Sequence, residues 1–301
     1  MMDTFASMSI DAPVVKLRAS DLLKLAQDCQ RYVQVTSCLG CISIFILTIG
    51  LWITHMIFPK SWKPINIPDL IRVGPQDDGG YCTSRAAIAS SSRLISFGLN
   101  DDWSFEEDFL KIKNVPVDCY DHSVNSRFWR IHFVKSLLTG RFGKLNKSIK
   151  YRKFFDRHSV THHARKIGYD LDNGISLNTI MSSAGFGEIF LKIDIEGGEY
   201  RILDQIVEHQ HRFPAILMEL HDIDVHEDRI REFIRQLKSH AIVWMNGNNY
   251  GDQTPDGNPV VIEVSFVRSD FIDAAAASDA REDITYVNNP AAPPIAIKFE
   301  A

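Results

Sequence analysis

The side chains best placed by type and spacing to do chemistry are Asp194 and Glu196, in the stretch LKIDIEGGEYRIL (191–203). The apolar residues before them predict a buried strand, and alternation along a strand would place both carboxylates on one face. The two glycines that follow allow a ligand to approach the backbone closely. Glu199 then has the position of an acid in the first turn of a helix. Helix charge accounts for Glu199, but it does not account for the pair of acids before it.

Two earlier strand ends have the layout of a nucleoside-binding α/β unit. An apolar run, LISF (94–97), leads into Gly98, and a second, VDCY (117–120), leads into Asp121. In such units the first turn exposes backbone N–H groups to the ligand, and the acid after the next strand hydrogen-bonds a ribose diol. The turn FGLNDD has only one glycine, so an ordinary α/β turn remains an alternative.

Candidates for a proton-accepting base lie at the predicted carboxyl ends of strands, where α/β folds bind ligands. They are Asp194, Glu196, Glu219, His221 and Asp222. His221 is attractive because imidazole titrates near neutral pH, although a histidine can also serve only as a hydrogen-bonding group there. The prediction includes no metal, but a divalent ion held by Asp194, Glu196 and Asp222 is left open as an alternative.

These residues require a scaffold of alternating strands and helices, and the sequence between Asp77 and Asp270 has that pattern. Strands are predicted at 189–195 and 215–220, with helical spacing after each. The apolar runs 241–245 and 260–267 flank a loop rich in Asn, Gly, Asp and Pro, which predicts a terminal hairpin. The expected class is therefore α/β, Rossmann-like, with a mostly parallel sheet.

The N-terminal part predicts a membrane anchor. The apolar stretch from Cys38 to Phe58 contains no charged residue and is long enough to cross a bilayer as one helix. Trp52 and Trp62 suit interfacial positions, and a proline-containing stem is expected at 59–76. Residues 1–37 are an N-terminal tail, and residues 271–301 are a C-terminal strap or disordered tail. Lysines and arginines before the span favour a cytoplasmic N-terminus and an extracytoplasmic domain.

Composition excludes some classes of function. The net charge of −5 and the lack of a dense run of Lys and Arg argue against a nucleic-acid partner. Cys38 and Cys41 form a CxxC with no second pair, which argues against a zinc or redox site. The segment between Asp121 and Leu177 is basic and aromatic. It is either a lid that attracts an acidic substrate or a solvated helical insertion with a basic face, and the second interpretation is favoured.

The motif KIDIEGGE (192–199) resembles the signature of FkbM-type methyltransferases, which are class I enzymes that use S-adenosylmethionine. Further similar stretches follow in the same order over residues 77–268: DDGGY, LISFGLNDDWSFEEDF, YDHSV, MELHDID, MNGNNYGDQ and VIEVSFVR. The resemblance implies a seven-stranded sheet whose last strand is antiparallel. It also implies O-methyl transfer to the hydroxyl of a glycan or another small molecule.

The resemblance also implies roles for single residues. Gly98 and Asn100 would line the methionine end of S-adenosylmethionine, and Asp102 of the same loop is a further candidate for cofactor binding. Asp121 would take the ribose hydroxyls, and Asp194 would lie beside the transferring methyl group. Independently of the resemblance, their positions at predicted strand ends make Asp194, Glu196, His221 and Asp222 the expected catalytic residues.

Two other functions remain as alternatives. One is a catalytically inactive methyltransferase fold that acts as a membrane-anchored binding module. The presence of only one glycine in the loop FGLNDD favours this alternative. The other is a nicotinamide-dependent oxidoreductase, which requires a glycine-rich fingerprint that this chain lacks. Binding of the cofactor without turnover would indicate the first.

Overall fold

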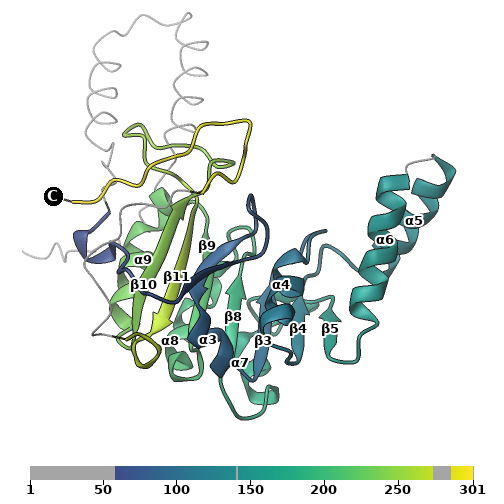
Figure 1. The fold of residues 1–301 in the computed structure, drawn as a ribbon, viewed down its shortest axis with the longest axis horizontal. Helices are drawn as coiled ribbons and strands as arrows, with labels where there is room; N and C mark the ends of the chain where they lie inside the picture. Colours follow the sequence, from purple (N-terminus) through teal and green to yellow (C-terminus); the bar gives the residue numbers. More distant parts are fainter. Residues whose placement is uncertain (1–57, 140–141, 274–285, 301) are drawn as a thin grey trace, which may run out of the picture. The chain divides into compact units, whose positions relative to one another are not determined.

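The computed structural model describes residues 58–300, except 140–141 and 274–285 (Figure 1). Residues from Met56 to the C-terminus form one compact unit. The predicted N-terminal tail and the predicted membrane span lie outside the described residues, apart from Phe58. Among the residues that are described, none of the helices combines the length and the apolar character that crossing a bilayer requires.

A seven-stranded sheet forms the centre of the unit, in the order β10-β11-β9-β8-β3-β4-β5. Strands β3, β4, β5, β8 and β9 pair in parallel, whereas β11 is antiparallel to both β9 and β10. This confirms the predicted α/β class and the terminal antiparallel hairpin. The strands are β3 (Arg93–Phe97), β4 (Val117–Tyr120), β5 (Val160–His163), β8 (Ile189–Ile193), β9 (Ala215–Leu220), β10 (His240–Gly247) and β11 (Ile262–Arg268).

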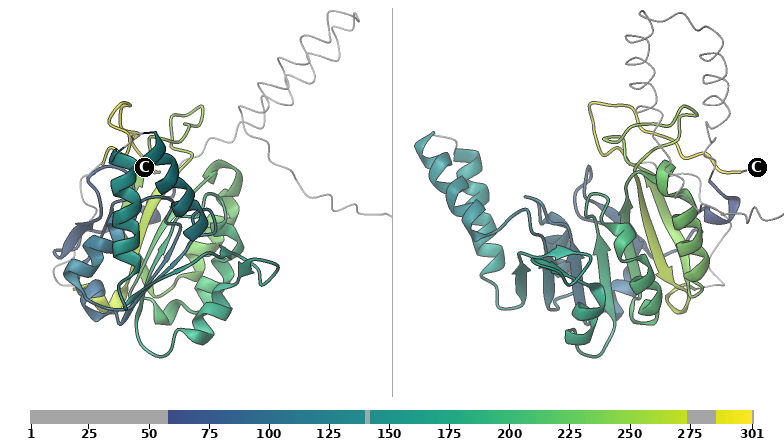
Figure 2. Two further views of the ribbon diagram at one scale, coloured as in Figure 1. Left: turned by 90° about the vertical axis from the view of Figure 1, so that its right-hand side faces the viewer. Right: turned by 180° about the vertical axis from the view of Figure 1, so that it is seen from behind.

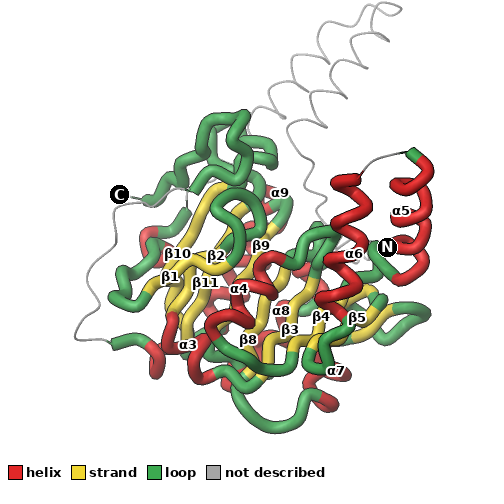
Figure 3. Tube along the Cα trace, turned by 45° about the vertical axis from the view of Figure 1, so that its right-hand side comes forward, coloured by secondary structure: helices red, strands yellow, loops and turns green. Residues whose placement is uncertain are grey.

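Alternation along these strands divides the core into two apolar clusters, one on each face of the sheet. Phe97 of β3 and Leu191 of β8 belong to one cluster. Leu94 of β3 and Phe190 of β8 belong to the other. Both faces are covered, as a parallel sheet requires, and Figures 2 and 3 show helices on either side of the strands. The first cluster includes residues of α7 (Leu177–Ser183), α8 (Leu203–Glu208) and α9 (Ile223–Gln236); the second includes residues of α3 (Arg85–Ser90), α4 (Ser104–Ile112) and the hairpin of β1 (Leu70–Val73) and β2 (Tyr81–Ser84).

The path of the chain places a crevice at the carboxyl ends of the parallel strands. From β3 the chain moves outward to β4 and β5, and it then returns to the other side of β3 for β8 and β9. The direction reverses between β3 and β8, so the loops after these strands diverge to opposite faces. In open α/β sheets, ligands bind in the crevice outside the carboxyl ends of the strands at such a switch point.

The predicted stem differs from the structure, because it contributes to the folded unit, whereas residues 286–300 of the C-terminal tail form an irregular strap, one of the two predicted alternatives. Trp62, expected at a membrane interface, is 4% exposed in the core, with the guanidinium of Arg231 5.5 Å from its ring centre. Phe58 is fully buried and pairs with Phe299, so it does not belong to a membrane span. Residues 286–300 pack on the same unit, where Ile295 is buried and forms a β-bridge with Gly247 of β10. Burial of aromatic surface explains why a proline-containing segment is ordered here.

The basic segment contains two helices, α5 (Ser126–Leu138) and α6 (Phe142–Phe155), which form a hairpin before β5. The hairpin extends beyond the β5 edge of the sheet (Figures 1 and 2). The short strands β6 (Lys166–Ile167) and β7 (Gly174–Ile175) follow β5. No hydrophobic pattern predicted β5, because its residues VTHH are mostly polar. The structure thus has a helical insertion, as the favoured interpretation expected.

Candidate active site

A cavity of about 940 Å³ opens at the carboxyl ends of β3, β4, β8 and β9. Its wall consists mainly of the loops 98–102, 121–123 and 194–198, with Glu219 near the end of β9 and His221 directly after that strand. The cavity therefore lies at the switch point and brings together most of the predicted site residues. No described side chain of α5 or α6 lines it, so the hairpin is not a lid in this structure.

Gly98 makes the closest backbone contact in the site. Its φ is +81°, and a Cβ atom there would lie 1.4 Å from the carbonyl oxygen of Asp194. The peptide N–H of Asp194 donates to the carbonyl of Phe97 at 2.8 Å, which holds the two strand ends together. Only glycine fits this position, both in conformation and in space. The single glycine of the loop thus joins the loop after β3 to the loop after β8.

Asp121 holds the loop after β3 instead of presenting a free carboxylate to the cavity. Its Oδ2 accepts hydrogen bonds from the N–H groups of Leu99 and Asn100, and its Oδ1 accepts two from Ser123. Burial alone would raise the pKa of Asp121, but these hydrogen bonds lower it below its usual value. All four lone-pair sites of the carboxylate are used, so a ribose hydroxyl would have to displace one of these donors.

Three residues that were predicted to act in the site have left-handed backbone conformations. The φ values are +47° at Asn100, +53° at Glu196 and +51° at Asp222. Residues other than glycine adopt this region at a cost, and such residues cluster at functional sites. Asn100 and Glu196 line the cavity, whereas Asp222 does not. Asp102 lines the cavity and accepts a hydrogen bond from the N–H of Ser104.

Asp222 and Glu196 do not have the placement that the sequence predicted. Asp222 is the residue before α9 and lies outside the lining of the cavity, so its catalytic role stays a prediction that this placement does not support. Strand β8 ends at Ile193, so strand alternation does not reach Glu196. The left-handed turn at Glu196 directs its side chain outward, where it is 83% exposed.

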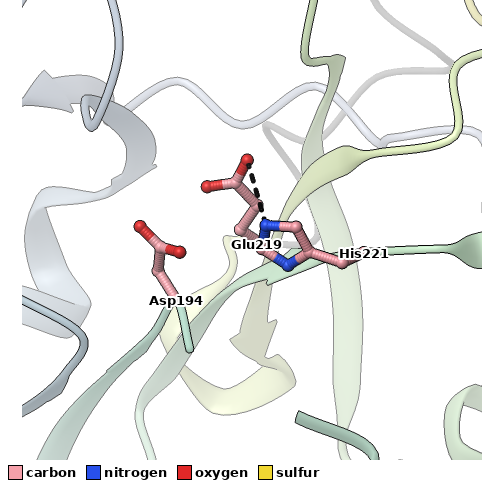
Figure 4. Close-up of side chains that lie close together, drawn as sticks. All are labelled: Asp194, Glu219 and His221. Atoms are coloured by element: carbon pink, nitrogen blue, oxygen red, sulfur yellow. Dashed lines mark ion pairs between the residues drawn. The ribbon is translucent and has the colours of Figure 1, made fainter. Parts of the chain in front are cut away.

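Asp194, Glu219 and His221 form a compact group of potential ligand atoms (Figure 4). One oxygen of each carboxylate and one ring nitrogen of His221 lie within 4.8 Å of one another. Carboxylate oxygens and imidazole nitrogen are ligands of zinc and related divalent ions. The set differs from the predicted metal alternative, because Glu219 and His221 replace Glu196 and Asp222.

His221 is oriented by Glu199, a residue that the sequence placed only as a helix-start charge. Oε1 of Glu199 accepts hydrogen bonds from the N–H groups of Ile195 and Gly197, and it lies 3.2 Å from Nδ1 of His221. This fixes the proton of His221 on Nδ1 and leaves Nε2 directed toward Glu196 at 3.4 Å and Glu219 at 4.0 Å. Burial alone would lower the pKa of His221, but Glu199 and the other acids raise it above its usual value.

The floor of the cavity carries more negative than positive groups. Burial raises the pKa of Asp194, with Lys192 and His221 opposing that effect. Burial also raises the pKa of Glu219 well above its usual value, and the charge of Asp194 adds to the shift. Asn248 donates a hydrogen bond to Oε1 of Glu219 at 2.6 Å. Such a site favours a cationic ligand, whose charge would let both acids ionise.

Lys192 and Glu106 are site residues that sequence reasoning missed. Lys192 is the one basic residue of β8, and its Nζ donates to the carbonyl of Gly98 at 3.3 Å. Burial would lower the pKa of Lys192, but Glu106, Asp194 and Glu219 raise it. Glu106 accepts a 2.6 Å hydrogen bond from Ser96. A charged residue inside an otherwise apolar strand was the available signal for Lys192.

No family model and no curated protein matches this chain. Solved structures with a similar arrangement include an rRNA methylase from Streptococcus thermophilus, 9% identical, covering 61% of this chain and 92% of the methylase, with a TM-score of 0.33. A precorrin-6y C5,15-methyltransferase from Geobacter metallireducens is 11% identical, covering 61% and 87%, with a TM-score of 0.32. The Methanococcus jannaschii fibrillarin pre-rRNA processing protein is 10% identical, covering 60% and 68%, with a TM-score of 0.33.

The order of the strands decides the fold. When the seven strands are numbered in chain order and read along the sheet from β5, the order is 3-2-1-4-5-7-6. The seventh strand, β11, is antiparallel and lies between β9 and β10. This is the class I methyltransferase fold. At the identities and TM-scores above, the similar structures carry no information about the substrate of this chain.

Proposed function

We propose that this chain is an S-adenosylmethionine-dependent O-methyltransferase of the FkbM type that acts on a hydroxyl of a glycan or another small molecule. The observation that carries the proposal is the cavity at the switch point of a methyltransferase fold, lined by Asp194 and by His221, whose ring pairs with the buried Glu199. The motif KIDIEGGE, which resembles that family, forms part of this wall.

The residues present fit the proposed cofactor at its methionine end. Gly98 lets the loop after β3 pack directly against the carbonyl oxygen of Asp194, which brings these two cavity-lining loops together. Asp194 and Glu219 supply negative charge opposite a sulfonium. Asn100 and Asp102 complete the wall on the β3 side. When bound, S-adenosylmethionine supplies a methyl group on a positively charged sulfur, and the electron pair of the broken S–C bond stays on that sulfur.

His221 is the base in this proposal. The acceptor hydroxyl oxygen forms the new C–O bond, and its proton passes to Nε2 of His221, whose Nδ1 proton remains hydrogen-bonded to Glu199. Glu199 holds the ring in the orientation that directs Nε2 toward the cavity. Asn248, which binds Glu219 and lines the cavity, is placed to orient a polyol. The imidazolium formed in this step is stabilised by the neighbouring carboxylates.

Transfer of a labelled methyl group to an array of glycans and small-molecule hydroxyls tests the proposal. The wild-type unit is expected to label at least one acceptor, and His221→Asn is expected to label the same acceptor far more slowly. Binding of S-adenosylmethionine without any labelling would favour the inactive binding module. Labelling of a nitrogen or carbon atom would contradict the O-methyl assignment. Membrane anchorage through the apolar segment that precedes Phe58 stays a prediction, as does the extracytoplasmic side.

A further inference from the structure

The α5–α6 hairpin has an inner face that the fold explains. The rings of Trp129 and Tyr151 stack across the two helices, with centroids 4.5 Å apart, and Trp103 of the body packs against both. Lys147 of α6 pairs with Asp101 at 2.8 Å. These contacts satisfy the side of the hairpin that faces the body. None of these contacts involves the opposite side of α5, so packing against the body does not account for the residues on that side.

That opposite side exposes aliphatic side chains in a helical stripe. Ile131, Val134 and Leu138 follow the i, i+3, i+7 spacing and are 57%, 52% and 82% exposed. Leu137, at 59%, lies beside the stripe. A surface helix normally carries apolar residues only on the face toward its own core. Grouped exposed aliphatic residues on a projecting element indicate a surface that another apolar phase covers.

Basic side chains border the same stripe. Residues 126–157 contain ten Lys or Arg and a single acid, Asp156, in a chain whose net charge is −5. On α5, the exposed Arg127, Arg130 and Lys135 form no ion pair with any residue that the structure describes. The outer face of the hairpin therefore combines unpaired positive charge with exposed aliphatic surface.

We propose that the hairpin docks on the surface of an anionic phospholipid bilayer. Ile131, Val134 and Leu138 enter the boundary between headgroups and acyl chains, while Arg127, Arg130 and Lys135 bind lipid phosphates. Single-stranded nucleic acid is the less suitable partner, because its bases stack on aromatic rings and the most exposed residues of this stripe are aliphatic. This inference is independent of the methyltransferase proposal and of the N-terminal segment.

Sedimentation with vesicles tests the proposal on residues 56–301, whose two core clusters lie wholly within that fragment. The fragment is expected to bind phosphatidylcholine vesicles that contain phosphatidylserine, and to bind pure phosphatidylcholine far more weakly. The variant R127Q/R130Q/K135Q is expected to weaken binding by roughly five-fold per charge. The variant I131S/V134S/L138S is expected to weaken it by roughly ten-fold per side chain.

Matched controls separate the hairpin from general surface effects. L171S/F186S removes two exposed apolar residues elsewhere, and K63Q/K113Q/K238Q removes three positive charges elsewhere; both are expected to bind like the wild type. Circular dichroism melting checks that every variant is folded. Absence of binding to anionic vesicles, or equal losses in the control variants, would overturn the proposal. So would a dependence on the basic residues alone, accompanied by tight binding to polyuridylate, which would indicate nucleic acid instead.

Discussion

Nδ1 of His221 lies 3.2 Å from Oε1 of Glu199, a carboxylate with no exposed surface that also accepts two backbone N–H groups. A buried carboxylate in this position fixes both the tautomer and the orientation of the imidazole, as in the dyads that activate nucleophiles. Because Nε2 is then directed into the cavity, the pair forms a preorganised acceptor for a proton.

Removal of the base should reduce turnover without weakening cofactor binding. His221→Asn keeps a polar side chain but cannot accept a proton, so kcat should fall roughly 10²- to 10⁴-fold. The Kd for S-adenosylmethionine should change little, because His221 acts on the acceptor. His211→Asn, an exposed histidine remote from the cavity, is the matched control. A loss of less than ten-fold would exclude His221 as the base.

The pH dependence of kcat should report the pKa of His221. The neutral ring is the active form, and its pKa is raised above the usual value by Glu199 and the neighbouring acids. The rate should therefore rise with pH through an inflection above that usual value. Glu199→Gln should move the inflection to lower pH and also reduce kcat, since the ring loses its orienting partner. Glu196→Gln, which removes an exposed and weaker neighbour, should move the inflection less. An unchanged profile in Glu199→Gln would contradict the dyad.

Only part of this site could be predicted from the sequence. Asp194 and His221 could be predicted because the carboxyl ends of parallel strands lie on the same side of the sheet. The strand predicted at 215–220 covers the same residues as β9. Glu199 was not recognised, because the left-handed turn at Glu196 reverses the chain in a way that strand alternation does not anticipate. Asp222 also has a left-handed backbone conformation and lies outside the cavity lining, a placement that its position after a strand did not indicate.

The residue at which the domain begins also could not be predicted from the sequence, and nor could its edge strand β5. The short strand β1 has four residues, too few for an alternation pattern to be distinguished from a stem. Strand β5 is polar because it lies at the edge of the sheet, where only part of its surface is buried. The pairing of β5 with β4 joins segments far apart in the sequence, and single-sequence patterns do not contain it.

Binding of S-adenosylmethionine should release protons. The pKa values of Asp194 and Glu219 are raised in the free protein, and a sulfonium cation nearby would lower them. Affinity should therefore increase as pH rises through the raised pKa values and then level off. S-adenosylhomocysteine has a neutral sulfur and should show a flatter dependence. Calorimetry in buffers of different ionisation enthalpy measures the released protons, and equal release for both ligands would contradict this account.

Gly98→Ala should damage both stability and binding. The new Cβ would overlap the carbonyl oxygen of Asp194, so the junction of β3 and β8 has to open. We expect a loss of roughly 2–4 kcal/mol in the free energy of unfolding. Gly185→Ala has a similar positive φ with nothing within 4 Å, so it should lose only about 1–2 kcal/mol. Urea denaturation measures both, and equal losses would show that conformation alone matters at Gly98.

Divalent ions should compete with the proton at His221. Chelation is expected to leave turnover unchanged, because the proposed step uses Nε2 as a base. Added zinc should inhibit, since Asp194, Glu219 and His221 can ligate it together. Glu219→Gln should weaken that inhibition by roughly ten-fold or more. Loss of turnover on chelation, restored by a divalent ion, would show instead that the group works as a metal site.

Calorimetric titration of S-adenosylmethionine into residues 56–301 tests whether the cavity binds this cofactor. We expect saturable binding at micromolar concentrations that is lost in Gly98→Ala and retained in His221→Asn, with NAD giving no heat of binding. No binding of S-adenosylmethionine by a fragment that melts cooperatively would contradict it.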